Sequence, residues 1–247
     1  MKKALIIIPT YNEAENISSL IPAVLKQNKM VEVLVVDDNS PDGTGEIVST
    51  LAEKNPRVHL LDRPGKMGLG SAYIKGFKYA LEHGYEYVIE MDADFSHNPS
   101  DIPRLLDEIK DYDLVIGSRY VTGVNVVNWP IRRLLLSILA SRYVRFITRM
   151  PVKDPTSGFK CIRRAVLESL DFDNIMSDGY SFQIEIHYKI WKSGWRIKEI
   201  PIVFTERRDG KSKMSKRIVW EAIFTVWKLR FFPIFWEWRT RKKRDNA

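Results

Sequence analysis

The feature that most constrains the fold is a regular alternation of short apolar runs and helix-like segments in the first half of the chain. Five runs have the length and apolar content of strands: 4–9, 31–38, 57–62, 85–92 and 113–117. Between them, apolar residues recur at helical spacing in 13–28, 43–54, 68–83 and 100–111. Strands that alternate with helices form a mostly parallel sheet with helices on both faces. The sequence therefore predicts an α/β fold.

The second half is less regular. We expect a basic helix over 131–149, a turn at 154–159, a helix over 180–193 and a strand over 195–204. A last helical pattern begins near Met214 and becomes aromatic at 231–238, where the sequence reads FFPIFWEW. This tail is the most unusual part of the second half.

The net charge of +8 is concentrated in the C-terminal part of the chain. Residues 205–247 contain 13 Lys and Arg against 5 Asp and Glu, so the first 204 residues are neutral. A basic, aromatic tail predicts contact with an anionic membrane surface. A solvated tail, or aromatics that pack on the domain, is the alternative. A transmembrane helix is not expected, because charged residues and Pro233 interrupt 218–238.

The single cysteine, Cys161, excludes an internal disulfide and indicates a reducing compartment. The first apolar run is too short for a signal peptide. We therefore expect a cytoplasmic protein, peripherally associated with the cytoplasmic face of a membrane, and no nucleic-acid partner.

Polar clusters follow four of the predicted strands. The sequence reads PTYNE at 9–13, DDNSPDGT at 37–44, MDAD at 91–94 and GSRY at 117–120. The carboxyl ends of parallel strands meet at one edge of a sheet, and ligands of this fold class bind there. We therefore expect the four clusters to form one site.

The MDAD cluster predicts a metal. Asp92 and Asp94 are two residues apart, and such residues face the same side of an extended chain. Two neighbouring carboxylates repel each other unless a cation lies between them. Mg²⁺ or Mn²⁺ prefers such oxygen ligands and often binds substrate phosphates as well. A capped strand end is the alternative, and we interpret His97 as a loop residue and not as a ligand.

Several segments offer groups for phosphate. Gly68 and Gly70 open a helix, whose amino-terminal amides favour an anion. Arg119 follows a strand, and Arg133 and Ser137 are one turn apart on the basic helix, as a phosphate cradle requires. The loop at 205–214, TERRDGKSKM, is expected to close over phosphates.

The remainder of the basic helix predicts a lipid-facing surface. Its later arginines recur at helical spacing, and we expect them to lie opposite an apolar stripe. The arginines are Arg142, Arg145 and Arg149, and the stripe consists of Leu135, Leu139, Tyr143 and Ile147. Ordinary surface charge is the alternative.

Together these segments resemble the polyprenol-phosphate (dolichol-phosphate) mannosyltransferases, a branch of the family-2 inverting glycosyltransferases. The shared motifs run in order from PTYNE through DDNSPDGT, KMGLGSAYIKGF, MDADFSHNP, GSRY, NWPIRRLLLS, DPTSGFK and GYSFQIE to FTERRDGKSKM, over 4–214. PTYNE and the Asp pair mark the broad superfamily, whereas SHNP, GSRY with NWP, and GKSKM narrow it to this branch. The resemblance implies a glycosyltransferase-A (Rossmann-like) fold, a GDP-mannose donor, a divalent metal and a polyprenyl-phosphate acceptor in the membrane. It leaves room for a membrane-anchoring partner protein.

The resemblance also assigns roles to residues. Asp92 and Asp94 would hold the metal. This chain departs from some relatives at Phe95, where they have a polar side chain near the metal, so a third protein ligand is not expected there. The acceptor phosphate would be bound by Arg119, Arg133 and Ser137. The nucleotide sugar would be bound by Pro9, Tyr11, Glu13, Asp37, Asp38, Asp92, Ala93, Gln183, Glu185, Arg207 and Lys213. Within this set, Gln183 and Glu185 would line the sugar pocket, and Arg207 and Lys213 would close on the diphosphate. Catalysis would rest on Asp94, Arg119 and Arg133.

We therefore expect a glycosyltransferase domain over 1–213 and an amphipathic, membrane-interfacial segment over 214–247. The expected reaction transfers mannose from GDP-mannose to polyprenyl phosphate with inversion. The alternatives are the same fold with UDP-glucose as donor, a nucleotidyltransferase, and a non-catalytic membrane-surface binder of sugar nucleotides. A nucleotidyltransferase usually has a GxGxRL-like segment where this chain has PTYNE, and intact Asp92, Asp94 and Arg119 argue against a mere binder.

Overall fold

The computed structural model describes residues 3–175, 177, 179–205 and 216–231 of the chain. Its centre is a seven-stranded sheet with the strand order β3-β2-β1-β4-β7-β5-β8. The strands are β1 (Ala4–Thr10), β2 (Val31–Asp37), β3 (Val58–Asp62), β4 (Tyr87–Glu90), β5 (Leu114–Ser118), β7 (Lys160–Arg163) and β8 (Ile197–Pro201). Two short strands, β6 (Val126–Val127) and β9 (Phe204–Thr205), form a separate parallel pair.

All neighbouring strands of the large sheet are parallel except β7, which is antiparallel to both β4 and β5. The predicted α/β fold with a mostly parallel sheet is confirmed. The sequence interpretation missed β7, because its four residues, KCIR, are too few to show a strand pattern. Since β7 runs against its neighbours, its first residue, Lys160, lies beside Glu90, the last residue of β4.

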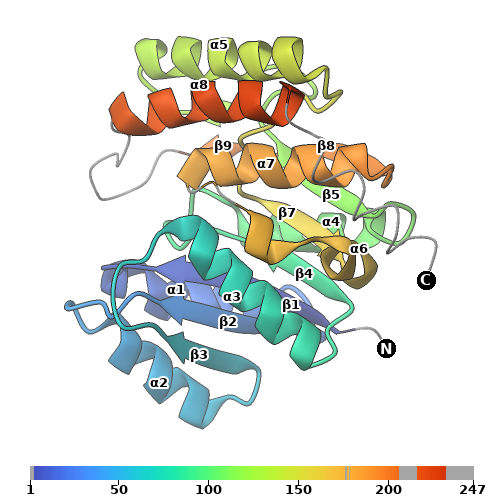
Figure 1. Cartoon of the computed structure of the whole chain (residues 1–247). Coiled ribbons are helices and arrows are strands. Elements are labelled where there is room, and N and C mark those ends of the chain that lie inside the picture. Colours follow the sequence, from blue (N-terminus) through green and yellow to red (C-terminus); the bar gives the residue numbers. More distant parts are fainter. Residues whose placement is uncertain (1–2, 176, 178, 206–215, 232–247) are drawn as a thin grey trace.

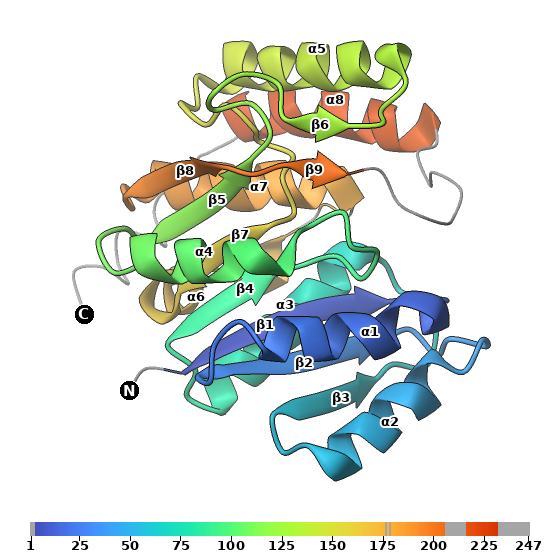
Figure 2. The same cartoon turned by 180° about the vertical axis from the view of Figure 1, so that it is seen from behind.

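Helices cover both faces of the sheet (Figures 1 and 2). On one face, α1 (Ala14–Leu25), α2 (Thr44–Lys54) and α4 (Ile102–Glu108) enclose one apolar core. On the other face, α3 (Leu69–Glu82), α6 (Arg164–Ser169) and α7 (Gly179–Lys192) enclose a second core. Two short 3₁₀ helices, Pro99–Asp101 and Phe172–Asn174, lie in the connections. Because the helices bury both faces of the sheet, polar residues can gather at the edge where the parallel strands have their carboxyl ends.

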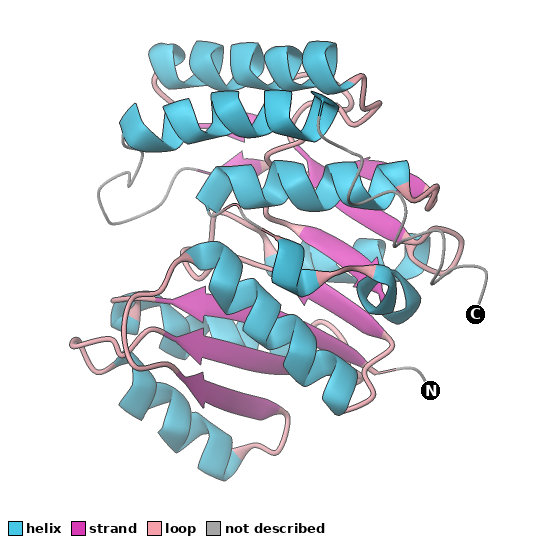
Figure 3. Ribbon diagram, viewed as in Figure 1, coloured by secondary structure: helices cyan, strands magenta, loops and turns pink. Residues whose placement is uncertain are grey.

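Two long helices extend the second face beyond α7. They are α5 (Ile131–Thr148) and α8 (Lys216–Phe231), and α8 packs against both α7 and α5. In Figure 3 they lie side by side as the uppermost helices of the molecule. None of the helices in the described part of the chain is long and apolar enough to cross a membrane.

The predicted arrangement of α5 is wrong in one respect. Its inward face is formed by Ser141, Val144 and Thr148. Leu135 and Leu139 are exposed on the outward face together with Arg142, and are not opposite the arginines. The physical reason is the spacing, because steps of four and three residues place positions 135, 139 and 142 on one face of a helix.

Two predicted strands are shorter in the structure. The strand expected over 195–204 divides into β8 and β9, which belong to different sheets. The strand expected over 85–92 is β4, which ends at Glu90. Asp92 and Asp94 therefore lie in the loop after β4 and not within the strand.

Candidate active site

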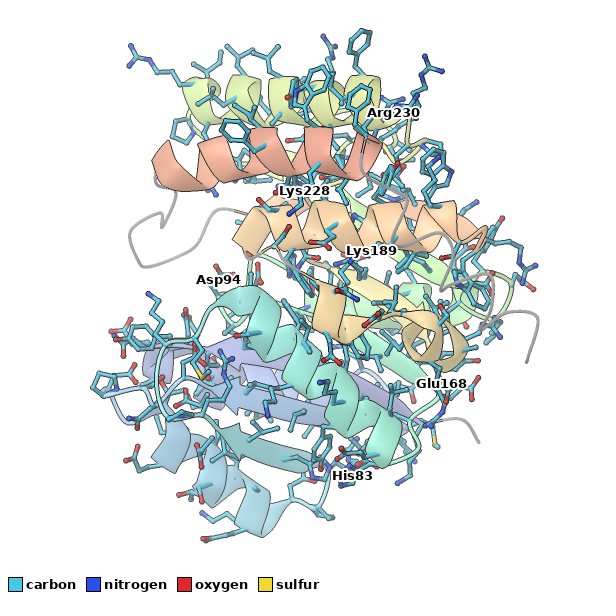
Figure 4. All side chains as sticks on the ribbon, in the orientation of Figure 1. His83, Asp94, Glu168, Lys189, Lys228 and Arg230 are labelled. Atoms are coloured by element: carbon cyan, nitrogen blue, oxygen red, sulfur yellow. The ribbon has the colours of Figure 1, made fainter. Side chains whose placement is uncertain are left out.

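The polar clusters predicted at the strand ends do meet at one edge of the sheet. Figure 4 shows Asp94 at this edge, close to the start of α3. Gly158, in the turn before β7, lies where Asp92 of the MDAD cluster approaches His97 and Gln183. A Cβ atom added at Gly158 would lie 3.6 Å from Gln183 Nε2, 3.8 Å from His97 Cε1 and 3.9 Å from Asp92 Oδ1. Residues distant in sequence thus share one small region.

The loop after β4 is shaped by His97. The backbone N–H of Asp92 donates to His97 Nδ1 at 3.1 Å, and the imidazole stacks on Phe159 with ring centroids 4.9 Å apart. The ring is buried, and this burial lowers the pKa of His97. The neutral imidazole therefore holds the backbone of Asp92, which is a candidate metal ligand. The sequence interpretation did not include this role for His97.

The two carboxylates of this loop have different surroundings. Asp94 is buried, and its Oδ1 accepts hydrogen bonds from the backbone N–H and the hydroxyl of Ser96. The Asp92 side chain is 32% exposed. Phe95, which directly follows Asp94, has a φ of 57° and packs against the core beneath α1 and α4. This left-handed residue turns the chain so that both carboxylates belong to one tight loop.

The residues present fit a hard divalent cation. No set of three His, Cys, Asp or Glu side chains within the described ranges is arranged as a metal site. Two carboxylates, one buried and one reachable from solvent, match the way Mg²⁺ or Mn²⁺ binds few protein ligands together with substrate phosphates. Asp92 and Asp94 are the residues that would hold it.

The ends of β1 and β2 form the second part of the site. Asp37 is buried and accepts hydrogen bonds from Thr10 Oγ1 at 2.6 Å, from Ser40 N at 2.8 Å and from Ser40 Oγ at 2.6 Å. These contacts stabilise the turn after β2. The side chain of Tyr11 is half-buried, and Lys66 Nζ lies 4.6 Å from the centre of its ring.

Other residues predicted to bind the nucleotide lie at the same edge. The half-buried Pro9 is paired with Val36 at the end of β1, and Glu13 directly precedes α1. Asn16 Nδ2 donates to Glu13 Oε2 at 3.2 Å. Ala93 is buried between the two candidate metal ligands.

Asp38 forms an ion pair that the sequence interpretation missed. Arg63 Nε donates to Asp38 Oδ1 at 2.6 Å, and both residues are buried. The same guanidinium donates to Ser71 Oγ at 2.6 Å and to the Gly68 carbonyl at 3.0 Å. Arg63 therefore connects the end of β2 to the start of α3. The signal in the sequence was the position of Arg63 directly after a strand, because Arg119 also directly follows a strand that ends at this edge.

On the other side of the Asp pair, Arg119 is buried and held by several contacts. Its Nε donates to Asp154 Oδ2 at 2.7 Å, and its Nη2 donates to Asp154 Oδ1 at 2.6 Å and to Thr156 Oγ1 at 2.7 Å. Glu199 on β8 accepts from the backbone N–H groups of Lys153 and Asp154 at 2.7 and 2.9 Å. Asp154 and Glu199 were not predicted as part of the site.

The three residues predicted to bind the acceptor phosphate lie around two aromatic rings. The guanidinium carbon of Arg119 is 5.3 Å from the ring centre of Tyr120 and 5.6 Å from that of Trp129. Arg133 lies over the same Trp129 ring at 4.2 Å. The hydroxyl of Tyr120 donates to Ser137 Oγ at 2.7 Å. Arg119, Arg133 and Ser137 are therefore brought into one cluster from β5 and α5.

The two residues predicted to line the sugar pocket point to different neighbours. Gln183 is buried and donates from Nε2 to Glu90 Oε2 at 2.9 Å. Glu185 is also buried, pairs with Lys189 at 2.5 Å and accepts from Ser177 N at 3.1 Å. Only Gln183 lies close to Asp92 through Gly158. Arg207 and Lys213 lie outside the described residues.

Comparison with known proteins identifies the family of this chain. The model of the family "Glycosyl transferase family 2" matches residues 5–171. The chain is 47% identical over 248 residues to the polyprenol monophosphomannose synthase of Mycolicibacterium smegmatis. This alignment covers 100% of this chain and 90% of that protein. It is 46% identical over 224 residues to the undecaprenyl-phosphate mannosyltransferase of Micrococcus luteus, covering 91% of this chain and 92% of that protein.

A solved structure shows the same fold. Glucosyl-3-phosphoglycerate synthase from Mycobacterium tuberculosis, in complex with Mn²⁺, UDP and phosphoglyceric acid, aligns with a TM-score of 0.72 and 17% identity. The alignment covers 93% of this chain and 79% of that chain. The chain belongs to glycosyl transferase family 2, and within it to the polyprenyl-phosphate mannosyltransferases.

Proposed function

We propose that this protein transfers mannose from GDP-mannose to a polyprenyl phosphate with inversion, giving polyprenyl-phosphate β-mannose and GDP. The observation that carries the proposal is that contacts through His97 and Phe204 connect the Asp pair to the cluster of Arg119, Arg133 and Ser137. His97 accepts from the backbone of Asp92 and packs edge-on against Phe204, and Phe204 in turn contacts Trp129 and Arg119 of the cluster. An anion-binding cluster beside a donor site suits a phosphate acceptor. The names of the two relatives, polyprenol monophosphomannose synthase and undecaprenyl-phosphate mannosyltransferase, support mannose as the transferred sugar and a polyprenyl phosphate as the acceptor.

The donor is proposed to lie between the ends of β1 and β2 and the loop after β4. Tyr11, Asp38 and Ala93 line this part of the edge, and Gln183 approaches it from α7. The pairing of Asp38 with Arg63 places a buried charge pair next to the expected nucleotide. A divalent ion held by Asp92 and Asp94 would neutralise the charge that develops on the leaving diphosphate.

The acceptor needs little help from a general base. A phosphate monoester has its second pKa near 6, so most of it is dianionic at pH 7. The residues of the cluster then have to bind and orient the phosphate opposite the leaving group, so that one displacement inverts the anomeric carbon. Arg119 is held rigidly by Asp154, which suits a positioning role. Catalysis is therefore proposed to rest on orientation and charge stabilisation.

The reaction is tested with a panel of labelled nucleotide sugars, Mg²⁺ or Mn²⁺ and a polyprenyl phosphate. We expect label from GDP-mannose to enter the organic phase, with mild acid releasing mannose from the lipid. Transfer from UDP-glucose instead would favour the glucosyltransferase alternative. The absence of any transfer, with sugar nucleotides still bound, would favour a non-catalytic binder.

The acceptor cluster is tested by Arg133→Ala. Loss of one charge-assisted contact of about 1.5–3 kcal/mol should raise the acceptor KM about 10- to 100-fold. The donor KM should change little, because Arg133 lies over Trp129 on the α5 side of the site. Lys54→Ala, which removes one exposed positive charge from α2, is the matched control. Equal increases in both KM values would contradict the acceptor role.

We also propose that the outer surface of α5 and α8 contacts an anionic membrane. Large apolar side chains are exposed there: Ile131, Leu135, Leu136, Leu139 and Phe146 on α5, and Phe224, Trp227 and Phe231 on α8. Phe146 is 82% exposed. Arg142 and Arg145 are exposed on α5, and Lys228 and Arg230 extend from α8 (Figure 4). Apolar groups interspersed with cations favour the headgroup layer.

This surface adjoins the acceptor cluster, because α5 carries both Arg133 and the exposed apolar residues. A polyprenyl phosphate held in a membrane would thus reach the site without leaving the lipid. Residues 214–247 are proposed to form the interfacial segment of the chain, and α8 is its described part. The catalytic domain is proposed to comprise residues 1–213.

The membrane contact is tested by flotation with vesicles of phosphatidylcholine and phosphatidylglycerol. The double variant Leu139→Ser/Phe146→Ser should bind at least about tenfold more weakly, because burial of each side chain contributes about 1.5–3 kcal/mol. Met67→Ser, which changes an exposed apolar residue near the nucleotide side, is the control. Unchanged flotation of the double variant would point instead to a membrane-anchoring partner protein.

A further inference from the structure

A buried polar cluster lies next to the Asp pair, and two of its three members have no role in the function described above. It consists of Glu90 on β4, Lys160 on β7 and Gln183 on α7, and all three are at most 2% exposed. Lys160 Nζ donates to Glu90 Oε2 at 2.8 Å, and Gln183 Nε2 donates to the same oxygen at 2.9 Å. Lys160 Nζ also donates to Gln183 Oε1. Every member therefore contacts the other two.

The stability of the fold does not by itself call for such a cluster. Burial raises the pKa of Glu90 and lowers the pKa of Lys160, so the surroundings disfavour both charges, although each charge stabilises the other. A buried ion pair is often no more stabilising than well-packed apolar residues of similar size. An ion pair in this place therefore calls for another reason.

The position of the cluster suggests that reason. The register of β4 and β7 places Glu90 and Lys160 side by side at the edge that carries the site. Glu90 is two residues before Asp92 in the chain. Gln183 Nε2 and Asp92 Oδ1 both lie close to Gly158, because a Cβ atom added there would contact each of them. The cluster thus lies directly beside the loop that is proposed to hold the metal and the donor.

The chemistry of the three groups determines the orientation of one of them. An ammonium group only donates hydrogen bonds, and an ionised carboxylate only accepts them. The carboxamide of Gln183 therefore has to turn its oxygen to Lys160 and its nitrogen to Glu90. One N–H group and one lone pair of the carboxamide remain for a further partner. Glu90 Oε1 is a buried acceptor that has no hydrogen-bond partner among the described residues.

We propose that Glu90 and Lys160 are positioning residues that lock the carboxamide of Gln183 in one orientation toward the hydroxyl groups of the donor sugar. A hydroxyl both donates and accepts, so it matches a carboxamide whose N–H and oxygen are held in known directions. This inference rests on the proposed function, in which Gln183 lines the sugar pocket. It adds that the recognition of the sugar, and not of the nucleotide, depends on a buried ion pair behind that pocket.

The experiment compares Lys160→Met, the double variant Glu90→Gln/Lys160→Met, and Gln183→Met. Lys160→Met leaves a buried carboxylate without its cation and should lower the Tm sharply. The double variant removes both charges and should recover most of that Tm. If the pair positions Gln183, the double variant should still bind the donor sugar nucleotide at least about tenfold more weakly, the loss that corresponds to one hydrogen bond of about 1.4 kcal/mol.

The decisive measurement is the ratio of two affinities. The dissociation constant of GDP-mannose should increase in the double variant, whereas that of GDP should stay unchanged. Gln183→Met should produce the same shift in this ratio, and its combination with the double variant should produce no further shift. Asp113→Asn is the stability control, because Asp113 is buried at the opposite end of β5 and pairs there with the partly buried Arg163 and the exposed Arg196. It should lower the Tm without changing the ratio.

Two outcomes would overturn the inference. If the double variant recovers both the Tm and the GDP-mannose affinity, the pair is only structural. If the affinities for GDP and GDP-mannose fall together, the cluster acts on the whole site and not on the sugar. A failure of the proposed function is recognised separately, because the wild-type protein would then use another nucleotide sugar in the labelled panel. The ratio would in that case be measured with that donor and its free nucleotide.

Discussion

Replacement of Asp94 by Asn should lower the turnover number of mannosyl transfer by about two to three orders of magnitude, the size of effect seen when one preorganised charge-stabilising group is lost. Asn has the same shape, and its oxygen can still accept the hydrogen bonds from the backbone and hydroxyl of Ser96. The substitution therefore removes the charge and keeps the loop. The loss of activity is measured with labelled GDP-mannose, and the fold is checked by thermal unfolding.

The matched control for this variant is Asp107→Asn. Asp107 is an exposed acid on α4, and it forms an ion pair with Lys110 in the turn after that helix. The change in charge is the same, and activity should stay at the wild-type level. Turnover of Asp94→Asn close to that of the control would refute the assignment of Asp94 to the metal. Titration with Mn²⁺ provides a second readout, because the apparent metal affinity should fall in Asp94→Asn alone.

Removal of the carboxylate of Asp154 should lower the free energy of unfolding by about 3–5 kcal/mol, since it leaves the buried guanidinium of Arg119 without its counter-ion. Asp154→Ala also releases the backbone N–H of Arg119, which donates to Asp154 Oδ2 at 2.9 Å. We expect a lower midpoint in urea denaturation and, in the folded fraction, weaker binding of the acceptor phosphate.

Two further variants show whether charge is the cause. Glu168→Ala removes a carboxylate from the ion pair with Arg164, in which the Glu168 side chain is half exposed, and should leave the urea midpoint unchanged. Asp154→Ala/Arg119→Met removes both charges of the buried pair and should recover part of the stability but not the activity. An Asp154→Ala midpoint equal to that of Glu168→Ala would show that the buried pair does not stabilise the fold.

The sequence predicted the features that depend on the order of neighbouring residues along the chain. The alternation of strands and helices predicted the α/β fold, and the polar residues after β1, β2, β4 and β5 predicted the edge that carries the site. Arg119, Arg133 and Ser137 could be grouped in advance because their motifs resemble one family. Glu185 lies in one of those motifs as well, yet its side chain points to Lys189 and Ser177 instead of Gly158.

The sequence was less informative for α5. Its apolar and basic residues were both visible, but their distribution around the helix was assigned wrongly. The structure places Leu135, Leu139 and Arg142 on one outward face. A surface helix of a globular protein usually turns its apolar side toward the core. That rule gives the wrong orientation when exposed apolar side chains are buried by a second surface, which is here proposed to be a lipid membrane.

By itself, the sequence determined the order of the elements, the strand-end location of the site and the identity of the Asp pair, because each depends on periodicity or on a short motif. Only the tertiary structure decided which charges are buried and with which partners. The pairs Arg119–Asp154, Glu90–Lys160 and Glu90–Gln183 join residues that are 35, 70 and 93 positions apart. The pair Glu90–Lys160 depends on the antiparallel insertion of β7. No local pattern specifies a contact that forms only when distant strands and helices pack together.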